Sequence, residues 1–158
     1  MKIVFLLTML LFAGFGFSQS VIYNPNEDAK FSLDSCISKA KKENKHVLVQ
    51  IGGNWCKWCI EFHRFAKADS KIDSLLNADY VYYLLNYSKE NKNPEMLSKL
   101  GFPQRFGFPV FVVINGDGVR LHTQNSSYLE DGGKSYDNKK VIEFLKQWSF
   151  DSIDPKNY

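Results

Sequence analysis

Charge of neither sign is in large excess in this sequence, and this excludes one broad class of partner. The chain has 20 lysine and arginine residues against 17 aspartate and glutamate residues, so its formal net charge is only +3 at pH 7. One local basic cluster is interrupted by an acidic residue and falls where a helix should end. It consists of Lys39, Lys41, Lys42 and Lys45, and Glu43 interrupts it. Cations at a helix C-terminus are a common structural feature, so we expect no nucleic-acid partner.

Cysteine is also scarce. The chain has three cysteines, an odd number, which argues against a set of purely structural disulfides. Cys56 and Cys59 form one Cys-x-x-Cys pair, whereas Cys36 stands alone. A second Cys-x-x-Cys or a His pair, which a structural zinc site usually needs, is missing. The sequence shows no low-complexity tract and no internal repeat, so repeat architectures are excluded.

The first residues have the layout of a secretory signal peptide. Lys2 gives a positive start, residues 3–17 are apolar apart from Thr8 and two glycines, and small or polar residues follow. The apolar run is shorter than the ~20 residues of a membrane span. We therefore expect cleavage near residues 18–20, with an uncleaved membrane anchor as the alternative. The mature protein is then exported, to the periplasm or to the extracellular space.

The remaining chain is long enough for one domain. We expect residues 1–18 to be the signal peptide, 19–30 an extended lead-in, 31–150 the domain and 151–158 a tail.

Hydrophobic periodicity predicts alternating helices and strands within this domain. Residues 33–40 repeat apolar side chains at helical spacing after Ser32, a good N-cap. The short β-branched run 46–51 is typical of a buried strand. The other predicted strands are residues 80–85, 109–114 and 119–123, and the other predicted helices are 56–68, a short one opening at Pro94, and one from Asp137 or Asn138 to Trp148. A hairpin turn at residues 115–118 joins the last two strands, and residues 124–135 are expected to be a long loop.

The order of elements defines the fold class. Helices between strands favour parallel neighbours, and the closing hairpin adds an antiparallel edge. We expect an α/β fold in three layers, with helices on both faces of a mixed central sheet.

Cys56 and Cys59 are the residues best suited to carry chemistry. Cys56 follows a strand by a few residues and opens a helix, where free N–H groups and the helix dipole stabilise a thiolate. Lys57 adds a cation beside it. Cys59 lies one helical turn further on and can reach back to Cys56. The pattern predicts thiol–disulfide exchange, with Cys56 as the nucleophile and Cys59 as the resolving thiol, and with no bound cofactor.

Other interpretations of this pair stay open. A structural disulfide is one of them, although a loop this short gains little entropy. A metal site with Cys56, Cys59 and His63 is a second, since the three share a helix face, but the missing ligands argue against it. We expect His63 to be a histidine on the helix surface. A lone Cys-x-x-Cys also occurs by chance. The preceding strand, Trp55 and the helix start make the pattern more specific.

These residues resemble the thioredoxin superfamily, in particular small exported members with a Trp-Cys-x-Trp-Cys centre. The specific segments are residues 47–59 and 106–114, and the resemblance covers roughly residues 31–148. It implies a thioredoxin-like fold in which Pro109 is a cis proline facing the disulfide. It also implies that Phe108 presents its backbone to a partner's extended chain. The side chains expected to contact the partner are Trp55, Lys57, Trp58, Phe108 and Pro109.

Three positions depart from the family pattern. Gln50 stands where many thioredoxins carry a buried Asp that helps to deprotonate the second cysteine, and an amide cannot act as a base. Lys57-Trp58 stands between the two cysteines where thioredoxin has Gly-Pro, so the reduction potential of thioredoxin cannot be assigned to this chain. Val110 follows Pro109 where Thr is frequent.

Two further functions compete with the oxidoreductase. The fold could serve as a binding or chaperone-like module with a passive disulfide, or as a metal carrier. We favour an enzyme that acts on protein disulfides as a monomer, with a lean towards a reductase recharged by a membrane electron carrier. Cys36 is expected to be a small buried hydrophobe on the helical face of residues 33–40.

Overall fold

A four-stranded mixed sheet forms the centre of the protein. The computed structural model describes residues 20–158, so the predicted signal peptide lies outside the described residues. The strands are β1 (His46–Gly52), β2 (Tyr80–Asn86), β3 (Val110–Ile114) and β4 (Arg120–Asn125), in the sheet order β2-β1-β3-β4. Each lies within two residues of its predicted position.

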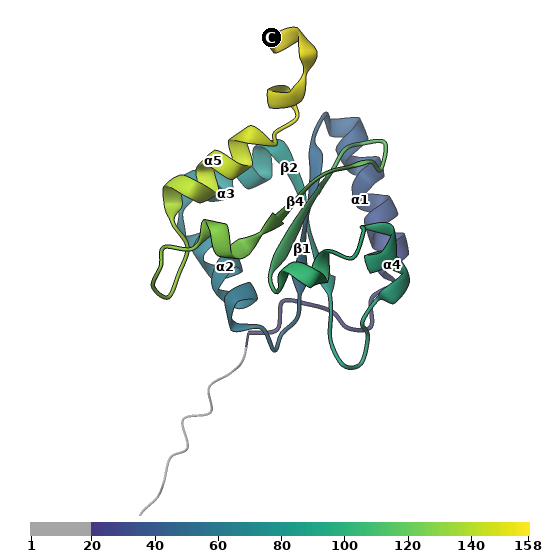
Figure 1. The fold of residues 1–158 in the computed structure, drawn as a ribbon. Coiled ribbons are helices and arrows are strands. Elements are labelled where there is room, and N and C mark those ends of the chain that lie inside the picture. The colour runs from purple at the N-terminus through teal and green to yellow at the C-terminus, as the bar shows by residue number, and fades with distance from the viewer. Residues whose placement is uncertain (1–19) are drawn as a thin grey trace, which may run out of the picture.

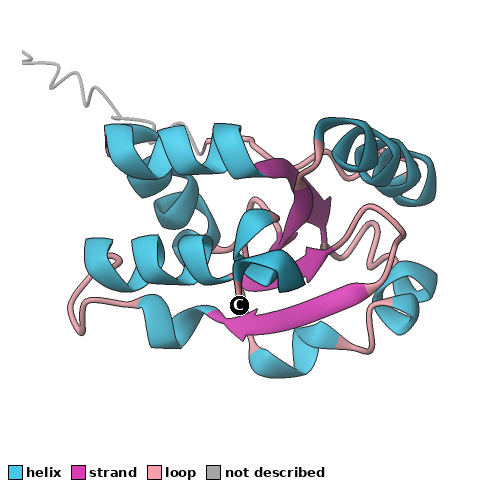
Figure 2. Ribbon diagram, turned by 90° about the horizontal axis from the view of Figure 1, so that it is seen from above, coloured by secondary structure: helices cyan, strands magenta, loops and turns pink. Residues whose placement is uncertain are grey.

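Helices cover both faces of this sheet (Figure 1 and Figure 2). On one face lie α1 (Ala29–Glu43) and α4 (Pro94–Lys99), and on the other lie α2 (Lys57–Ala68), α3 (Ser70–Asp79) and α5 (Asn138–Gln147). The three-layer α/β fold is therefore confirmed.

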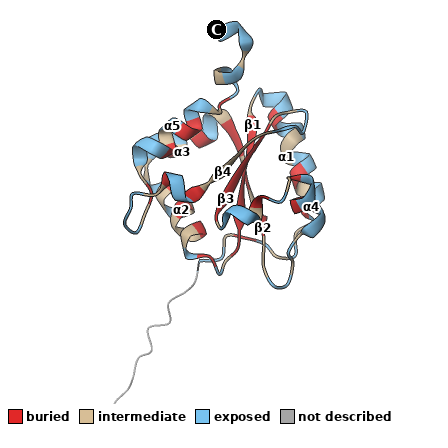
Figure 3. Cartoon of the chain, viewed as in Figure 1, coloured by how far each residue is buried: buried red, intermediate tan, exposed pale blue. Residues whose placement is uncertain are grey.

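Each face of the sheet has its own core, because successive strand residues point to opposite sides. Val47, Val49 and Ile51 of β1 pack beneath α1 and α4. Leu48 packs with Phe111 beneath α2, α3 and α5. Figure 3 shows the buried strands between helices that are buried only on their inner sides.

One neighbour relation differs from the prediction. β1 and β2 are parallel as expected, but β1 and β3 are antiparallel although helices separate them in sequence. The chain leaves β2 through α4 and the 3₁₀ turn η1 (Pro103–Phe106), and β3 starts beside the end of β1, with Val110 opposite Ile51. This connection begins and ends at the same end of the sheet, so the strand runs back. The hairpin to β4 is antiparallel as predicted.

Two helix predictions were also wrong. The first helix begins at Ala29, capped by the carboxylate of Asp28 and not by Ser32, so the lead-in is shorter than predicted. The prediction also omitted α3. Asp69 ends α2 and at once caps α3, accepting hydrogen bonds from the backbone N–H groups of Lys71 and Ile72. The cap predicted for the last helix, Asp137, is confirmed.

The segment predicted as a long loop is more ordered than expected. It starts within β4, forms the 3₁₀ turn η2 (Ser126–Leu129) and then closes through a bridge between Glu130 and Tyr136. Two further turns, η3 (Asp151–Ile153) and η4 (Pro155–Asn157), project from the body of the fold at the C-terminus (Figure 1). Within residues 20–158, no helix is both long enough and apolar enough to cross a membrane.

Candidate functional site

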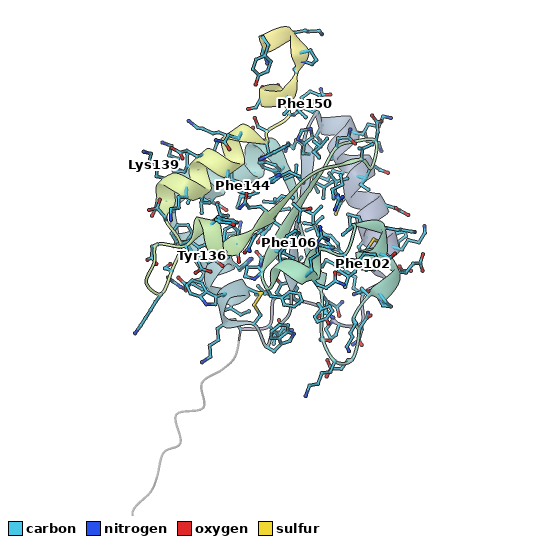
Figure 4. The ribbon with its side chains drawn as sticks, viewed as in Figure 1. Phe102, Phe106, Tyr136, Lys139, Phe144 and Phe150 are labelled. Atoms are coloured by element: carbon cyan, nitrogen blue, oxygen red, sulfur yellow. A yellow bond between two sulfur atoms is a disulfide. The ribbon has the colours of Figure 1, made fainter. Side chains whose placement is uncertain are left out.

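The two paired cysteines lie where β1 passes into α2. Cys56 is the N-cap residue of α2, with extended backbone angles, and Cys59 lies in the first turn of the helix. The two form a disulfide, with their Cα atoms 5.2 Å apart. Figure 4 shows the disulfide at the end of the fold where α2 starts, away from the C-terminal turns.

The surroundings of the two sulfurs differ. Cys56 is 5% exposed and Cys59 is fully buried. The backbone N–H of Cys59 donates to Cys56 Sγ over 3.1 Å. The Cys56 sulfur therefore occupies the capping position, where unpaired N–H groups and the helix dipole favour negative charge. In the reduced protein this arrangement favours the thiolate form of Cys56.

Gly52, the last residue of β1, lets the second sulfur approach the strand. A Cβ at this position would overlap Cys59 Sγ and would lie 2.9 Å from the Tyr23 hydroxyl oxygen. No side chain fits here without moving the disulfide.

An aromatic group borders the disulfide on one side. Trp55 is 51% exposed, and its Nε1–H donates to the Tyr87 carbonyl over 2.7 Å. Its ring meets Phe108 edge-on at 5.3 Å, and Phe108 stacks on Tyr87 at 4.8 Å. Phe108 also packs against the buried cluster that contains the two cysteines. A hollow of about 610 Å³, lined in part by Trp55, Tyr87 and Pro25, lies beside this group.

Trp58 and Lys57 border the disulfide through α2. The Trp58 ring is half-buried and meets Tyr136 edge-on at 5.5 Å, while the Tyr136 hydroxyl donates to the Trp58 carbonyl over 3.1 Å. Tyr136 is labelled in Figure 4, close to α2. Lys57 is exposed and lines a shallow depression with Glu61. The Arg64 guanidinium holds the pKa of the Glu61 carboxyl below its usual value.

The peptide bond between Phe108 and Pro109 is cis, as the resemblance implied, and Pro109 is buried directly before β3. Of the five predicted partner-contact residues, Trp55, Trp58 and Phe108 are thus brought around the disulfide, with Lys57 on the exposed side of α2 and Pro109 following Phe108.

The predictions missed one residue that borders the buried sulfur. Tyr23, from the lead-in, forms a small buried cluster with Cys56 and Cys59. Asn54 holds this part of the chain. Its Oδ1 accepts from the N–H groups of Ile22 and Tyr23 over 2.9 Å each, and its Nδ2 donates to the Tyr23 carbonyl over 2.8 Å. The lead-in has no periodicity that could have placed Tyr23 here.

Gln50 is fully buried within β1 and bonded to its surroundings on every side. Its Nε2 donates to the Tyr23 hydroxyl over 2.6 Å and to the Cys59 carbonyl over 3.0 Å, while the Tyr82 hydroxyl donates to its Oε1. A polar residue in a buried strand was the sequence signal for this network.

His63 and Cys36 differ from their predicted environments. His63 was expected on the helix surface but is partly buried, and its ring stacks on Tyr82 at 6.4 Å. Burial lowers the pKa of its imidazole. Cys36 is half-buried, where full burial was expected, because α1 turns it towards the edge of the core, and desolvation raises the pKa of its thiol. Among residues 20–158, no three His, Cys, Asp or Glu side chains gather as a metal site.

Comparison with known proteins places this geometry in a family. A family model described as thioredoxin-like matches residues 28–116, more than half of the chain. The chain belongs to the thioredoxin-like family. No curated protein sequence matches it.

Solved structures share the thioredoxin-like fold. A disulphide isomerase from Xylella fastidiosa Temecula1 superposes with a TM-score of 0.71 at 22% identity, over 81% of this chain and 96% of that chain. The C-terminal domain of DsbD from Neisseria meningitidis, in its oxidised form, gives a TM-score of 0.51 at 17% identity, over 75% and 95% of the two chains. The reduced form of the same domain gives a TM-score of 0.51 at 18% identity, over 75% of this chain and 96% of that chain. Family membership and the Cys56–Cys59 disulfide together support a thiol–disulfide oxidoreductase in the general sense.

Proposed function

We propose that the protein is an exported thiol–disulfide oxidoreductase that reduces disulfides in other proteins, with Cys56 as its nucleophile and Cys59 as its resolving thiol. One observation carries this proposal. The Cys56–Cys59 disulfide lies at the N-terminus of α2, with the less buried cysteine at the capping position and the other fully buried.

The exchange takes two steps. The Cys56 thiolate attacks one sulfur of the client disulfide, so a mixed disulfide forms and the other client sulfur leaves as a thiolate. The Cys59 thiolate then attacks Cys56 Sγ, which closes the Cys56–Cys59 disulfide and releases the second client thiolate. The client gains two electrons and the protein loses two. A dithiol carrier must return them, and we propose a membrane electron carrier, because a domain of this size has no electron source of its own.

The client contacts follow from the aromatic border of the site. Trp55 and Phe108 on one side and Trp58 on the other offer apolar surface at the sulfur that reacts first. Pro109 has no N–H, and Phe108 before it has backbone groups available for strand-like docking of an extended client. Lys57 is a cation at the same edge. These five residues are proposed to select unfolded or extended segments and not one defined surface.

A turnover assay tests the proposal. With dithiothreitol as reductant and disulfide-bonded insulin as client, the wild type should reduce insulin far faster than dithiothreitol alone. Cys56→Ser should abolish this acceleration, and Ser35→Ala, an exposed change on α1, serves as the matched control. Insulin reduction by the wild type at the uncatalysed rate would overturn the assignment.

The direction of electron flow needs its own measurement. A reductase requires a Cys56–Cys59 couple more reducing than roughly −200 mV, whereas an oxidase of the DsbA kind lies near about −120 mV. Equilibration with glutathione buffers gives the value, and a potential on the oxidising side would contradict the reductase assignment.

A client-binding module is the second candidate. The observation that favours it is the exposed Trp55 ring beside a hollow of about 610 Å³. In that case Cys56→Ser would retain full function in preventing client aggregation, while Trp55→Ala would lose it.

A further inference from the structure

The hydrogen bonds around Gln50 fix the orientation of its amide. A carbonyl oxygen only accepts, so the atom 3.0 Å from the Cys59 carbonyl must be the amide nitrogen. The same nitrogen uses its second hydrogen to donate to the Tyr23 hydroxyl oxygen over 2.6 Å. The amide oxygen, on the other side, accepts from Tyr82. Both polar atoms of this buried side chain are therefore hydrogen-bonded, the nitrogen as donor and the oxygen as acceptor.

This orientation leaves the Tyr23 hydroxyl with a hydrogen to give. Its oxygen accepts from Gln50, so its own O–H is directed elsewhere. A Cβ on Gly52 would lie 2.9 Å from the Tyr23 hydroxyl oxygen and would overlap Cys59 Sγ, so both atoms border the same small space beside Gly52. Tyr23 and the two cysteines also pack as one buried cluster. The buried sulfur is thus a neighbour of the phenol within one cluster, and the hydrogen bond we infer belongs to the form in which the disulfide has opened.

Apolar side chains pack around the two cysteines and Tyr23. Within residues 20–158 the partly buried hydrophobic side chains packed against this cluster are Ile22, Trp58, Leu84 and Phe108. A thiolate formed in such surroundings loses its hydration, which disfavours the charged form. A hydrogen-bond donor at this place restores part of that loss.

We propose that Tyr23 is a catalytic residue whose hydroxyl donates a hydrogen bond to Cys59 Sγ once the disulfide opens, with Gln50 and Tyr82 as positioning residues. This inference rests on the thiol–disulfide exchange proposed above and adds the group that stabilises its buried thiolate.

The step balances without any further reactant. When a reducing partner's thiolate attacks Cys56 Sγ, a bond forms between those two sulfurs and the Cys56–Cys59 bond breaks. The electron pair passes to Cys59 Sγ, which becomes a thiolate and accepts the hydrogen bond from Tyr23, and the phenol keeps its proton. In the opposite direction the same thiolate attacks Cys56 Sγ of a mixed disulfide. The donor holds Cys59 in its reactive form in both directions.

The titratable groups around this site agree with a donor role. Burial raises the pKa of the Tyr23 phenol far above its usual value, and it does the same for Tyr82, so both keep their protons at neutral pH. His63 stacks on Tyr82, and burial lowers the pKa of its imidazole, which is therefore neutral there. Lys57 is exposed on the outer side of α2.

The direct test is a titration of Cys59 in isolation. The double variant Cys36→Ala/Cys56→Ala leaves Cys59 as the single thiol of the chain, so its ionisation is followed by the ultraviolet absorbance of the thiolate. Adding Tyr23→Phe should raise the Cys59 pKa by about one unit or more, the size expected for a lost hydrogen bond to a charged group. Adding Gln50→Leu should raise it by less, because the phenol remains but is no longer held.

Tyr80→Phe in the same background is the matched control. Tyr80 is equally buried, and its hydroxyl donates to the Leu145 carbonyl over 2.5 Å at the opposite end of β2. Its loss should lower stability without moving the Cys59 pKa. In the otherwise wild-type enzyme, Tyr23→Phe should lengthen the life of the mixed disulfide about tenfold, in line with a one-unit shift.

A second measurement tests the same hydrogen bond without substituting Tyr23. In the double variant the tyrosine absorbance should shift as Cys59 ionises, because the phenol gains a charged acceptor. An unchanged Cys59 pKa in Tyr23→Phe, or a tyrosine spectrum indifferent to Cys59 ionisation, overturns the inference. Neither titration uses a client, so a Tyr23-dependent pKa in a protein that reduces no insulin would overturn the proposed function alone.

Discussion

Among single residues, the two cysteines of the disulfide have different access to solvent and different hydrogen bonds. Cys56 is 5% exposed and lies at the N-cap of α2, while Cys59 is fully buried. In the reduced protein we expect an alkylating reagent at limiting concentration to modify Cys56 first, because its thiolate is stabilised at the helix N-cap and Cys56 is the less buried of the two cysteines. Peptide mapping by mass spectrometry measures the ratio. Preferential labelling of Cys59 would reverse the assigned roles.

The third cysteine has a structural role in this account. Cys36 is half-buried against the α1 side of the core. Cys36→Ala should leave insulin reduction close to the wild-type rate and lower the free energy of unfolding by about 1 kcal/mol or less, because a half-buried sulfur is lost. Urea unfolding and the turnover assay measure the two effects. A large loss of turnover with stability intact would show that Cys36 takes part in the chemistry.

The sequence was sufficient to identify residues near each other along the chain and insufficient for those brought together by folding. Cys56, Cys59 and Trp55 lie within one turn of each other, so their spacing in the sequence was enough to predict the candidate site. Tyr23 reaches Gln50 across 27 positions of sequence. Only the packing of the lead-in against Asn54 places Tyr23 at the site, and a segment without periodicity gives no sign of this.

At the scale of elements, the start of α1 shows how a local rule can select the wrong residue. Asp28 and Ser32 are both good N-cap residues, and the apolar repeat from Leu33 made Ser32 the expected one. The helix instead starts one turn earlier, because Ala29 adds a buried residue to the same face as Leu33. The omission of α3 has a related cause, since Asp69 can both end one helix and cap the next.

The α1 cap can be tested directly. Asp28 accepts a hydrogen bond from the Phe31 N–H over 3.0 Å. Asp28→Ala should lower the free energy of unfolding by about 1 kcal/mol, the usual effect of losing a cap. Ser35→Ala, an exposed change within the same helix, should have little effect. Urea unfolding of both variants gives the comparison, and equal stability of the two would mean that Asp28 does not cap the helix.

Strand direction could not be predicted from element order alone. Whether β3 runs with or against β1 depends on which end of the sheet the chain returns to, and this is decided by the short path through α4 and η1. The presence of a mixed sheet was predictable because the hairpin at residues 115–118 requires at least one antiparallel pair.

For the whole molecule, one buried and one partly buried histidine link stability to pH. His46 is 1% exposed, and its Nδ1–H donates to the Trp148 carbonyl over 2.9 Å, which ties β1 to the end of α5. Desolvation lowers the pKa of His46 despite this hydrogen bond, and burial lowers that of His63 as well. The unfolded chain therefore binds protons more readily than the folded one. The free energy of unfolding then falls as the pH drops below the histidine pKa of the unfolded chain.

This gives an expected pH profile. The urea midpoint should decrease between pH 7 and about 5.5, since an unfolded histidine titrates near 6.5. His46→Asn should make the decrease smaller, because one of the two histidines no longer contributes. A midpoint that rises on acidification, or an unchanged slope in His46→Asn, would contradict this explanation.

Covalent capture of a client tests the central claim most directly. Cys59→Ser removes the resolving thiol, so the reduced variant should form a stable mixed disulfide when it is mixed with disulfide-bonded insulin. We expect mass spectrometry of the complex to show one insulin molecule linked to Cys56 through one of its half-cystines. Absence of the complex, or linkage through Cys36, would contradict a disulfide exchange that begins at Cys56.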